Sequence, residues 1–348
     1  MNKTRLPITL LTGFLGAGKS TLLNRVLVDE RSGRLAIIVN EFGDVGLDHD
    51  LIQATDEDVT LLSSGCICCS IRGDLATTIP SLLERRASGA LQFDRIVIET
   101  TGLADPGPIQ RTLLTDPALA GAVQLDGIIT LADAVNGQRT LDAQFEAVSQ
   151  VAMADLIVLT KTDLATTSAA RALRKRLLGL NETARVVEVA DVVASPGMLW
   201  GRSGGRWDVT AREALDWLTP KPLVEAMDPL ANLSGMAATA APQPVALPHD
   251  GRISSASLVL DRPIKRAKLS KWISNLMDQR GSDILRIKGI VFLGGEPLPY
   301  VFHGVQHTFD SPVPLEGWQA GDTTSRIVMI ARDISSRRLE RLLDKLRR

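Results

Sequence analysis

The glycine-rich segment Gly13–Ser20 constrains the fold of this chain more than any other part of the sequence. It reads GFLGAGKS and fits the pattern G-x-x-x-x-G-K-[ST] at every constrained position. The apolar run Ile8–Leu11 before it predicts a strand, and Ser20–Val28 after it predicts a helix. Glycines let backbone N–H groups turn toward phosphate oxygens, and the positive end of the helix dipole adds to the attraction. The segment therefore predicts a nucleotide-phosphate loop formed by Gly13, Gly16, Ala17, Gly18, Lys19, Ser20 and Thr21.

Two side chains of this loop and one strand end predict the chemistry of a nucleotide hydrolase. We expect Lys19 to reach the β- and γ-phosphates and Ser20 to bind Mg²⁺ through its hydroxyl. The apolar run Ile96–Ile98 ends in Glu99, which is placed to hold Mg²⁺ through water or to orient the attacking water. Gly102 follows closely and can offer its N–H to the γ-phosphate. Lys19 and Glu99 are thus the expected catalytic residues, the alternative for Glu99 being an ordinary solvated strand end.

The segment Thr160–Asp163, which reads TKTD, indicates that the base is guanine. It resembles the guanine-specificity pattern N-K-x-D, with threonine in place of asparagine. The Asp163 carboxylate can accept both guanine N1–H and the exocyclic amine, a donor pair that adenine lacks, while Lys161 packs its stem along the base. An ordinary charged loop after a strand is the alternative. The sequence therefore favours GTP and GDP over adenine nucleotides.

Short apolar runs alternate with helical patterns over the first two-thirds of the chain. Their nearly continuous apolar character is typical of strands buried on both faces of a parallel sheet. This predicts an α/β fold with a doubly wound, mostly parallel sheet whose ligand lies beyond the carboxyl ends of the strands. The expected strands are Ile8–Leu11, Leu35–Val39, Val59–Leu62, Arg95–Ile98, Gly127–Leu131, Leu156–Leu159 and Arg185–Val189. The expected helices are Ser20–Val28, Gly73–Arg86, Arg139–Ala152 and Ser168–Leu178, the last of them capped by Gly179.

A second domain is expected beyond a linker. The pattern ends near Pro220, and the stretch Ala237–Pro248 has the alanine- and proline-rich composition of a linker. We expect residues 1–220 to form the nucleotide-binding domain, 221–251 the linker, and 252–348 a smaller C-terminal α+β domain with one exposed sheet face. Its expected elements are strands at Ser254–Leu260, Leu285–Phe292, Tyr300–His307 and Ser325–Ala331, the helix Lys265–Met277 and a basic helix Ser335–Leu346.

All three cysteines of the chain fall between positions 66 and 69. An odd number spaced this closely is not a disulfide framework, and clustered thiols in a reducing compartment more often bind metal or react. We expect Cys66 and Cys68 to share one side of an extended segment and Cys69 to open a turn. Three soft ligands suit Zn²⁺ or another thiophilic ion such as Co²⁺. A fourth ligand must come from elsewhere, and an open site of this kind suits metal transfer; buried apolar cysteines are the alternative.

The order of these motifs resembles that of CobW-type metallochaperone GTPases over nearly the whole chain. The matching segments are GFLGAGKST at the phosphate loop, NEFGDVGLD at Asn40–Asp48, GCICC at Gly65–Cys69, ETTG at Glu99–Gly102, TKTD at Thr160–Asp163, and HGVQH at His303–His307 within a C-terminal segment Leu285–Asp310. The resemblance implies a GTPase that delivers zinc or cobalt to a client metalloprotein, in settings that include cobalamin synthesis and the activation of nitrile hydratases. It also implies that Glu41 joins the cysteines as a ligand of the transferred metal and that Asp48 lies in a nucleotide-responsive switch.

Composition narrows the range of partners. A net charge of −1 and an aromatic content of 4% disfavour nucleic acid as a partner. No stretch approaches the roughly 20 apolar residues of a membrane span. We expect a cytoplasmic monomer or homodimer whose client metalloprotein binds through the C-terminal domain. Four histidines do not make the histidine-rich tract of many relatives, and we expect His303 and His307 to be structural or partner-facing rather than metal ligands.

The working hypothesis is a GTP-driven metal switch. Mg²⁺-GTP would order Asn40–Asp48 and bring Glu41 to the thiolates, and hydrolysis would release the metal to a client. The sequence assigns no intrinsic catalytic glutamine or arginine finger, so basal turnover is expected to be slow. A metal sensor or binding module, in which nucleotide only sets conformation, is the alternative. A redox switch made of the three cysteines is the third hypothesis.

Overall fold

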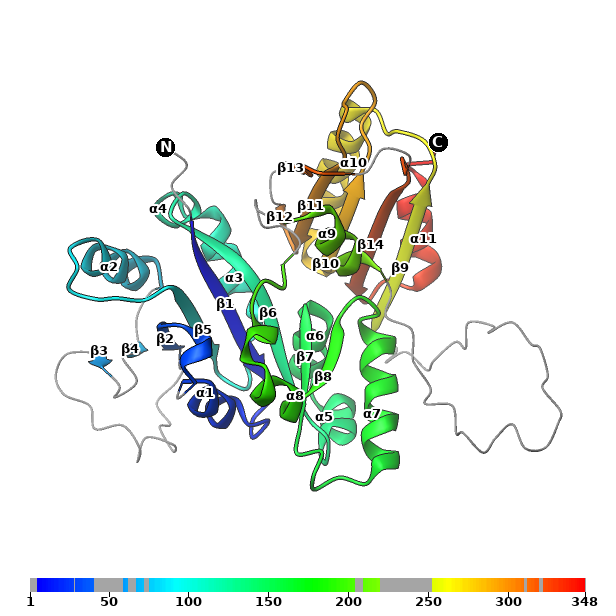
Figure 1. Ribbon diagram of the computed structural model, residues 1–348. Helices are drawn as coiled ribbons and strands as arrows, with labels where there is room; N and C mark the ends of the chain where they lie inside the picture. The colour runs from blue at the N-terminus through cyan, green and yellow to red at the C-terminus, as the bar shows by residue number, and fades with distance from the viewer. Residues whose placement is uncertain are drawn as a thin grey trace.

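The chain folds into two sheets with helices around them (Figure 1). The computed structural model describes residues 5–27, 29–40, 59–61, 67–71, 75–203, 209–219, 252–309, 312–318 and 322–347. The larger sheet has eight strands in the order β3-β4-β2-β5-β1-β6-β7-β8. Neighbouring strands are parallel, except that β3 is antiparallel to β4. The strands are β1 Leu6–Gly13, β2 Leu35–Asn40, β3 Val59–Leu61, β4 Ile67–Ile71, β5 Arg95–Thr100, β6 Val123–Asp133, β7 Leu156–Thr160 and β8 Arg185–Glu188.

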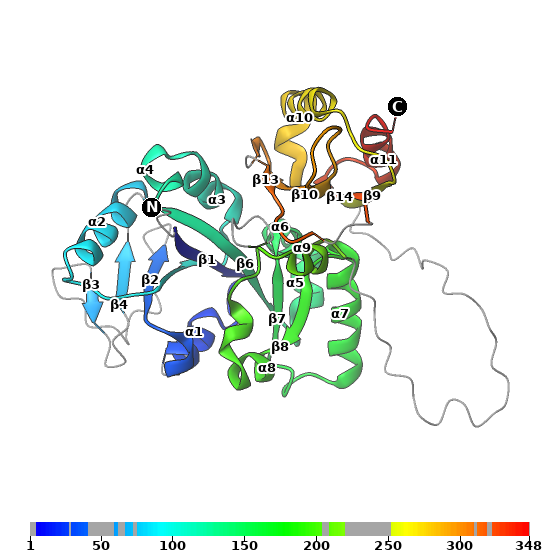
Figure 2. The same ribbon diagram turned by 45° about the horizontal axis from the view of Figure 1, so that its top comes forward.

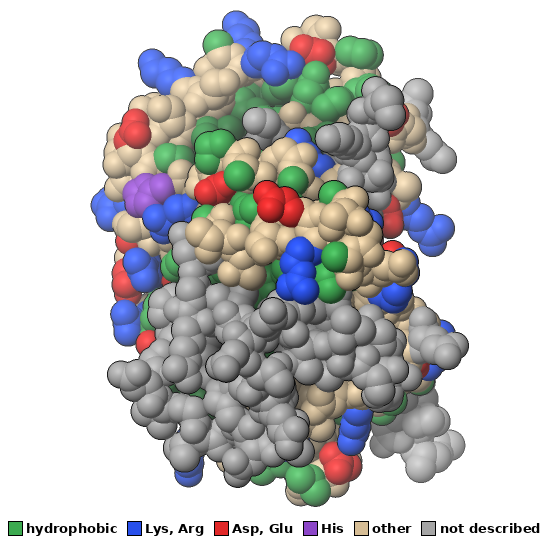
Figure 3. Space-filling view, turned by 90° about the vertical axis from the view of Figure 1, so that its left-hand side faces the viewer, with side chains coloured by type: hydrophobic (Ala, Val, Ile, Leu, Met, Phe, Trp, Pro, Cys, Tyr) green, Lys and Arg blue, Asp and Glu red, His purple; other side chains and the backbone are tan. Residues whose placement is uncertain are grey.

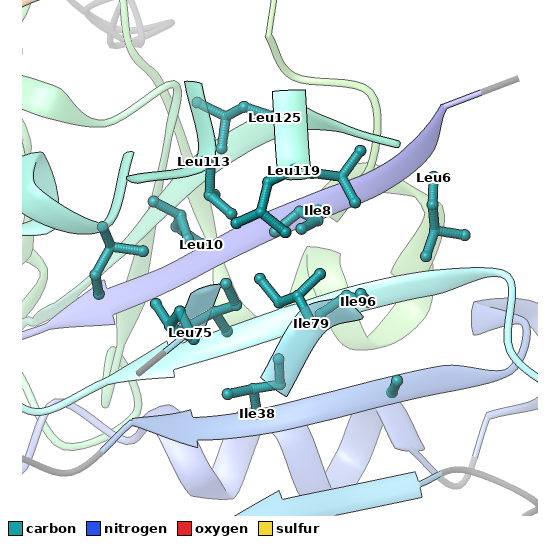
Figure 4. Packing of buried hydrophobic residues seen from close by; sticks show 14 of the residues in the cluster. Leu6, Ile8, Leu10, Ile38, Leu75, Ile79, Ile96, Leu113, Leu119 and Leu125 are labelled. Atoms are coloured by element: carbon teal, nitrogen blue, oxygen red, sulfur yellow. The ribbon is translucent and has the colours of Figure 1, made fainter. Parts of the chain in front are cut away.

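Helices cover both faces of this sheet, because alternate residues of its strands are apolar on both sides. Ile8 and Leu10 of β1 face one side and pack with α2, α3 and α4, as Figure 4 shows, whereas Leu11 faces the other and packs with α1 and α8. The predicted doubly wound, mostly parallel fold is confirmed. The helices are α1 Lys19–Leu27, α2 Leu75–Ala87, α3 Pro106–Thr115, α4 Pro117–Ala120, α5 Gly137–Ala143, α6 Phe145–Met153, α7 Thr167–Leu180 and α8 Val189–Ala194, with short 3₁₀ turns at Glu30–Ser32 and Pro196–Leu199.

Two expected helices differ from the prediction. The single helix Arg139–Ala152 is divided into α5 and α6, because Gln144 between them has extended backbone angles. Helix α7 does not end at Gly179. It continues to Leu180, which is buried with Leu173 in the same apolar cluster, so packing outweighs the tendency of glycine to end a helix.

The cysteine motif lies partly in a strand that the sequence did not predict. Cys68 and Cys69 belong to β4, which pairs with β2 on one side and with β3 on the other. The expectation that Cys69 opens a turn is therefore wrong. A strand of only five residues gives little periodic signal in the sequence.

The C-terminal domain has a six-stranded antiparallel sheet in the order β12-β11-β10-β14-β9, with β13 also paired to β11. Helices α10 and α11 cover the side away from the first domain (Figure 2). Lys and Arg side chains lie along the top of the molecule over this domain (Figure 3). The elements are β9 Ile253–Leu260, α10 Arg266–Arg280, a 3₁₀ turn Gly281–Asp283, β10 Ile284–Val291, β11 Tyr300–Val305, β12 Thr308–Phe309, β13 Val313–Pro314, β14 Ser325–Arg332 and α11 Ser336–Asp344.

The other face of the C-terminal sheet is buried, so the expected exposed face is wrong. Helix α9 (Ala211–Leu218) packs Trp217 and Leu218 against Ile290 and Val328. Nearer β7, Leu285 and neighbouring side chains join the apolar cluster of α6 and α7. The boundaries 1–220, 221–251 and 252–348 remain a proposal, because residues 220–251 lie outside the described part of the chain.

A buried ion cluster joins the two domains. The Asp155 carboxylate, directly before β7, is paired with Arg286 and lies 3.3 Å from Lys288 Nζ, both of them on β10. Arg286 also donates to the carbonyl of Met153, and Trp217 Nε1 donates to Asp155 Oδ1 at 2.7 Å. Strand β7 therefore connects this cluster, at its amino end, to the predicted base-binding segment at its carboxyl end.

The two histidines of the HGVQH segment do not lie on one strand. His303 is buried on β11, with its Nε2 2.9 Å from Gln110 Nε2 of α3 and its ring edge-on to Trp217. β11 ends at Val305, and Gln306 has φ of +51°, which places His307 in an exposed turn. His303 is thus part of the contact between the domains. Among the described residues, no helix is long and apolar enough to cross a membrane.

Candidate nucleotide site

The phosphate loop connects β1 to α1 at the carboxyl edge of the larger sheet. Gly13, Gly16 and Gly18 have φ of +142°, +73° and +93°, a region that side-chain-bearing residues rarely adopt. A Cβ on Gly13 would also lie 2.6 Å from the carbonyl oxygen of Leu131. The glycine pattern is thus explained by backbone geometry, and the loop ends at the amino terminus of α1, where anions bind favourably.

Lys19, Ser20 and Glu99 meet at this loop, as the sequence predicts. Lys19 Nζ donates to the carbonyl of Gly13 at 2.8 Å, and the Ser20 hydroxyl donates to Glu99 Oε1 at 3.0 Å. Glu99 is 8% exposed near the carboxyl end of β5. Burial lowers the pKa of Lys19, and the nearby Glu99 carboxylate offsets part of that effect.

The pair Ser20 and Glu99 fits the donor set of a magnesium ion. Both side chains offer hard oxygen atoms, and these lie 3.0 Å apart. Adjacent ligands of an octahedral Mg²⁺ at about 2.1 Å are themselves about 3 Å apart. The spacing therefore matches two neighbouring ligands, or one ligand and one water-mediated contact.

Gly102 packs directly on the phosphate loop. A Cβ at this position would lie 2.5 Å from the backbone nitrogen of Leu15, so only glycine allows this approach. The turn that follows is closed by a hydrogen bond from the Ala104 N–H to the Thr101 carbonyl, at 3.1 Å. Gly102 therefore lies beside the phosphate loop, where the sequence predicts a contact with the γ-phosphate.

Thr160 supports the phosphate loop from the side of the predicted base-binding segment, a role that the sequence does not predict. It is buried at the end of β7, and its hydroxyl donates to the carbonyl of Ala17 at 2.8 Å. It occupies the position of asparagine in N-K-x-D. The threonine that replaces asparagine in this pattern thus has a hydroxyl that holds the phosphate loop.

Replacing Thr160 with valine tests this contact. We expect Thr160→Val to weaken GTP and GDP binding alike by roughly 3- to 10-fold, because the Ala17 carbonyl loses a buried donor. Titration with a fluorescent GDP measures the change. Thr115→Val is the matched control, since Thr115 is an exposed residue of α3 that bonds the carbonyl of Arg111. Unchanged affinity in Thr160→Val would contradict the supporting role.

Lys161 and Asp163 lie in the turn after β7, at the same edge as the phosphate loop. Lys161 has φ of +56°, and its Nζ is 2.7 Å from Asp133 Oδ2 at the end of β6. Asp133 also accepts the N–H groups of Val135 and Asn136, and although burial opposes ionisation, these bonds and Lys161 lower the pKa of Asp133. Asp163 is exposed and available to a ligand. The sequence does not single out Asp133 as part of the site. The signal that could have done so is its position as a carboxylate at the end of a strand, at the same edge of the sheet.

The cysteine strand lies in register with the strand of Glu99. Cys69 is opposite Ile38 of β2, and Ile38 is opposite Ile98 of β5, the residue before Glu99. Two strand spacings separate Cys69 from Ile98, about 10 Å between backbones. Glu41, Asp48 and Cys66 lie outside the described residues, so their predicted roles stay predictions.

Two family models match the chain. Residues 7–188 match the family described as CobW/HypB/UreG, nucleotide-binding domain, and residues 253–347 match the cobalamin synthesis protein cobW C-terminal domain. The zinc chaperone YjiA of Escherichia coli is 35% identical over 307 residues, which are 87% of this chain and 87% of that protein. The zinc chaperone CobW of Pseudomonas aeruginosa is 28% identical over 364 residues, 95% of this chain and 88% of that protein. The zinc-regulated GTPase metalloprotein activator 1 of Schizosaccharomyces pombe is 38% identical over 192 residues, 52% of this chain and 45% of that protein.

Solved structures agree with the fold in both domains. The crystal structure of Zn(II)-bound YjiA GTPase from E. coli has a TM-score of 0.74 at 34% identity, covering 99% of this chain and 100% of that chain. A Zn(II)-bound triple mutant of YjiA GTPase has a TM-score of 0.77 at 33% identity, with the same coverage.

Proposed function

The chain belongs to the CobW/HypB/UreG nucleotide-binding family, and from this premise we propose that it is a GTP-hydrolysing metallochaperone that delivers Zn²⁺ to a client metalloprotein. One observation carries the proposal. The strand with Cys68 and Cys69 and the strand with Glu99 belong to one sheet and are separated by β2 alone. β2 ends at Asn40, immediately before Glu41. A change at the phosphates therefore has a short path to the metal ligands.

In the proposed hydrolysis, water attacks the γ-phosphorus while the bond to the β-phosphate oxygen breaks. Lys19 and the N–H of Gly102 stabilise the negative charge on the phosphoryl oxygens, and Glu99 orients the water. Ser20, with Glu99 through water, would hold Mg²⁺, and that ion would supply positive charge at the β- and γ-phosphates. Gly13, Gly16, Ala17, Gly18 and Thr21 complete the phosphate loop, and Asp163 with Lys161 selects guanine.

The transferred metal is the substrate of the second half of the reaction. Cys66, Cys68, Cys69 and Glu41 form the proposed ligand set, which suits Zn²⁺ and accepts Co²⁺ as well. Curated relatives named as zinc chaperones support zinc as the cargo. We further propose a cytoplasmic monomer or homodimer whose client contacts the C-terminal domain.

The test is the linkage between metal and nucleotide. If GTP binding builds the metal site, Zn²⁺ must tighten the binding of a non-hydrolysable GTP analogue by the factor by which the analogue tightens Zn²⁺. We expect a factor of roughly 10. Calorimetric titration of the analogue with and without Zn²⁺, at constant Mg²⁺, measures it. Cys66→Ser, Cys68→Ser and Cys69→Ser combined should abolish the factor and leave GDP affinity unchanged. Equal analogue affinity with and without Zn²⁺ in the unmodified protein would rule out coupling.

A further inference from the structure

Gln150 is a fully buried side chain of α6 that lies behind the phosphate loop. Its Nε2 donates to two carbonyl groups of the turn after β5, those of Gly102 at 3.1 Å and Ala104 at 3.0 Å. Gln150 also lines a pocket together with Phe14 and Leu15 of the phosphate loop. The amide thus connects a helix of the core to the turn that holds Gly102.

The turn Thr101–Ala104 has few side chains of its own with which to anchor. Gly102 has none, Ala104 is small, and Leu103 is 54% exposed. Glycine has more backbone freedom than any other residue, so the peptide groups on either side of Gly102 can rotate unless something holds them. Gln150 holds the Gly102 carbonyl and thereby restricts rotation of the peptide group that follows Gly102.

The hydrogen bonding of Gln150 is one-sided. Its Nε2 is used for the turn, whereas its buried Oε1 has no hydrogen-bond partner among the described residues. A buried acceptor without a partner is unfavourable, so an apolar side chain of the same shape would suit the core better. An apolar side chain could not donate hydrogen bonds to the turn, as the Gln150 amide does.

From this geometry we propose that Gln150 is a positioning residue that holds Gly102 in place for the γ-phosphate. The inference rests on the proposed function, since it gives Gly102 its γ-phosphate contact. Gln150 acts through the turn and does not itself touch the nucleotide. GDP has no γ-phosphate, so the role of Gln150 is restricted to the triphosphate state.

The test compares triphosphate and diphosphate binding in Gln150→Met, which keeps the length of the side chain and removes the donor. We expect the affinity for a non-hydrolysable GTP analogue and the kcat for GTP each to fall roughly tenfold, with GDP affinity within about twofold of the unmodified protein. Gln150→Glu, which places a carboxylate against two carbonyls, should have a larger effect of the same kind. The ratio of triphosphate to diphosphate affinity is also measured with a non-hydrolysable ATP analogue and ADP, so the test does not depend on whether the base is guanine.

Asn181 provides the matched control. Its Nδ2 donates to the carbonyls of Val151, Ala152 and Ala154 at the carboxyl end of α6, whereas the amide of Gln150 bonds the turn after β5. Asn181→Leu removes a similar buried amide, so it should lower thermal stability and leave the ratio of triphosphate to diphosphate affinity unchanged.

The possible outcomes separate this inference from the proposed function. A selective loss of triphosphate affinity in Gln150→Met supports the inference, even if the unmodified protein hydrolyses nothing and the hydrolase proposal fails. A parallel loss of both affinities, or no loss of either, overturns the inference while leaving the hydrolase proposal intact.

Discussion

Asp155→Asn is expected to lower the free energy of unfolding by about 3–5 kcal/mol, because it leaves Arg286 and Lys288 buried at the contact between the domains without the carboxylate they share. The Asp155 and Arg286 side chains are 1% and 2% exposed, so water cannot replace the lost charge. Thermal unfolding followed by circular dichroism should show an apparent melting temperature lower by about 10 °C.

The loss of stability at acid pH gives a second measure of how much the ion cluster around Asp155 contributes to stability. Burial opposes ionisation of Asp155, but Arg286, Lys288 and two N–H donors outweigh it and lower its pKa to about 2. A folded-state pKa below the ordinary value gives stability that is complete above about pH 4 and is lost as the pH falls toward 2. The contribution is about 2 kcal/mol. We expect the unmodified protein to lose stability more steeply than Asp155→Asn over this interval.

An exposed ion pair controls for a general effect of removing a charge. Asp94, 54% exposed, pairs with Arg34 at 3.1 Å, and Asp94→Asn should cost less than about 1 kcal/mol. The interpretation of the cluster is wrong if Asp155→Asn unfolds at the temperature of Asp94→Asn.

The larger sheet could be predicted because its strands are buried on both faces and carry a continuous apolar signal. Ile96–Ile98 and Leu156–Leu159 are examples, and the motif segments that carry Lys19 and Asp163 follow the strands β1 and β7. The burial of the C-terminal sheet could not be predicted in the same way. Arg286 and Lys288 alternate with apolar residues on β10, a pattern typical of a solvated face. Their burial depends on partners far away in the sequence, among them the Asp155 carboxylate and the Met153 carbonyl.

In the candidate site too, the sequence does not predict residues whose role depends on contacts with distant parts of the chain. Glycine and lysine in the phosphate loop have a fixed spacing that chemistry requires, so the sequence alone predicts them. Thr160, Asp133 and Gln150 act by supporting other groups, and the residues that they support, Ala17, Lys161 and Gly102, are 28 or more residues away in the chain. A glutamine inside an amphipathic helix gives no local sign that its amide ends at a turn beside the phosphate loop.

Lys19→Met is expected to reduce GTP hydrolysis by roughly 100- to 1000-fold, because it removes the positive charge placed at the β- and γ-phosphates. The Lys19 ammonium already lies at the loop, where it donates to the Gly13 carbonyl. Its charge is therefore in place without any rearrangement of the loop. Lys19→Arg should not restore the rate, since a planar guanidinium does not fit where a compact ammonium is enclosed by backbone carbonyls. Phosphate release under single-turnover conditions measures the loss.

The Lys19 variant also separates the two halves of the proposed activity. Lys19 lies on α1 and the cysteines lie on and before β4, so Lys19→Met should still bind Zn²⁺ in the absence of nucleotide while GTP no longer changes the zinc affinity. Arg25→Ala is the matched control, because Arg25 is an exposed cation in the last turn of the same helix and should leave hydrolysis unchanged. Hydrolysis by Lys19→Met within about threefold of the unmodified protein would show that the phosphate loop is not the site of the reaction. Loss of nucleotide-free zinc binding in Lys19→Met would instead show that the metal site depends on the loop itself.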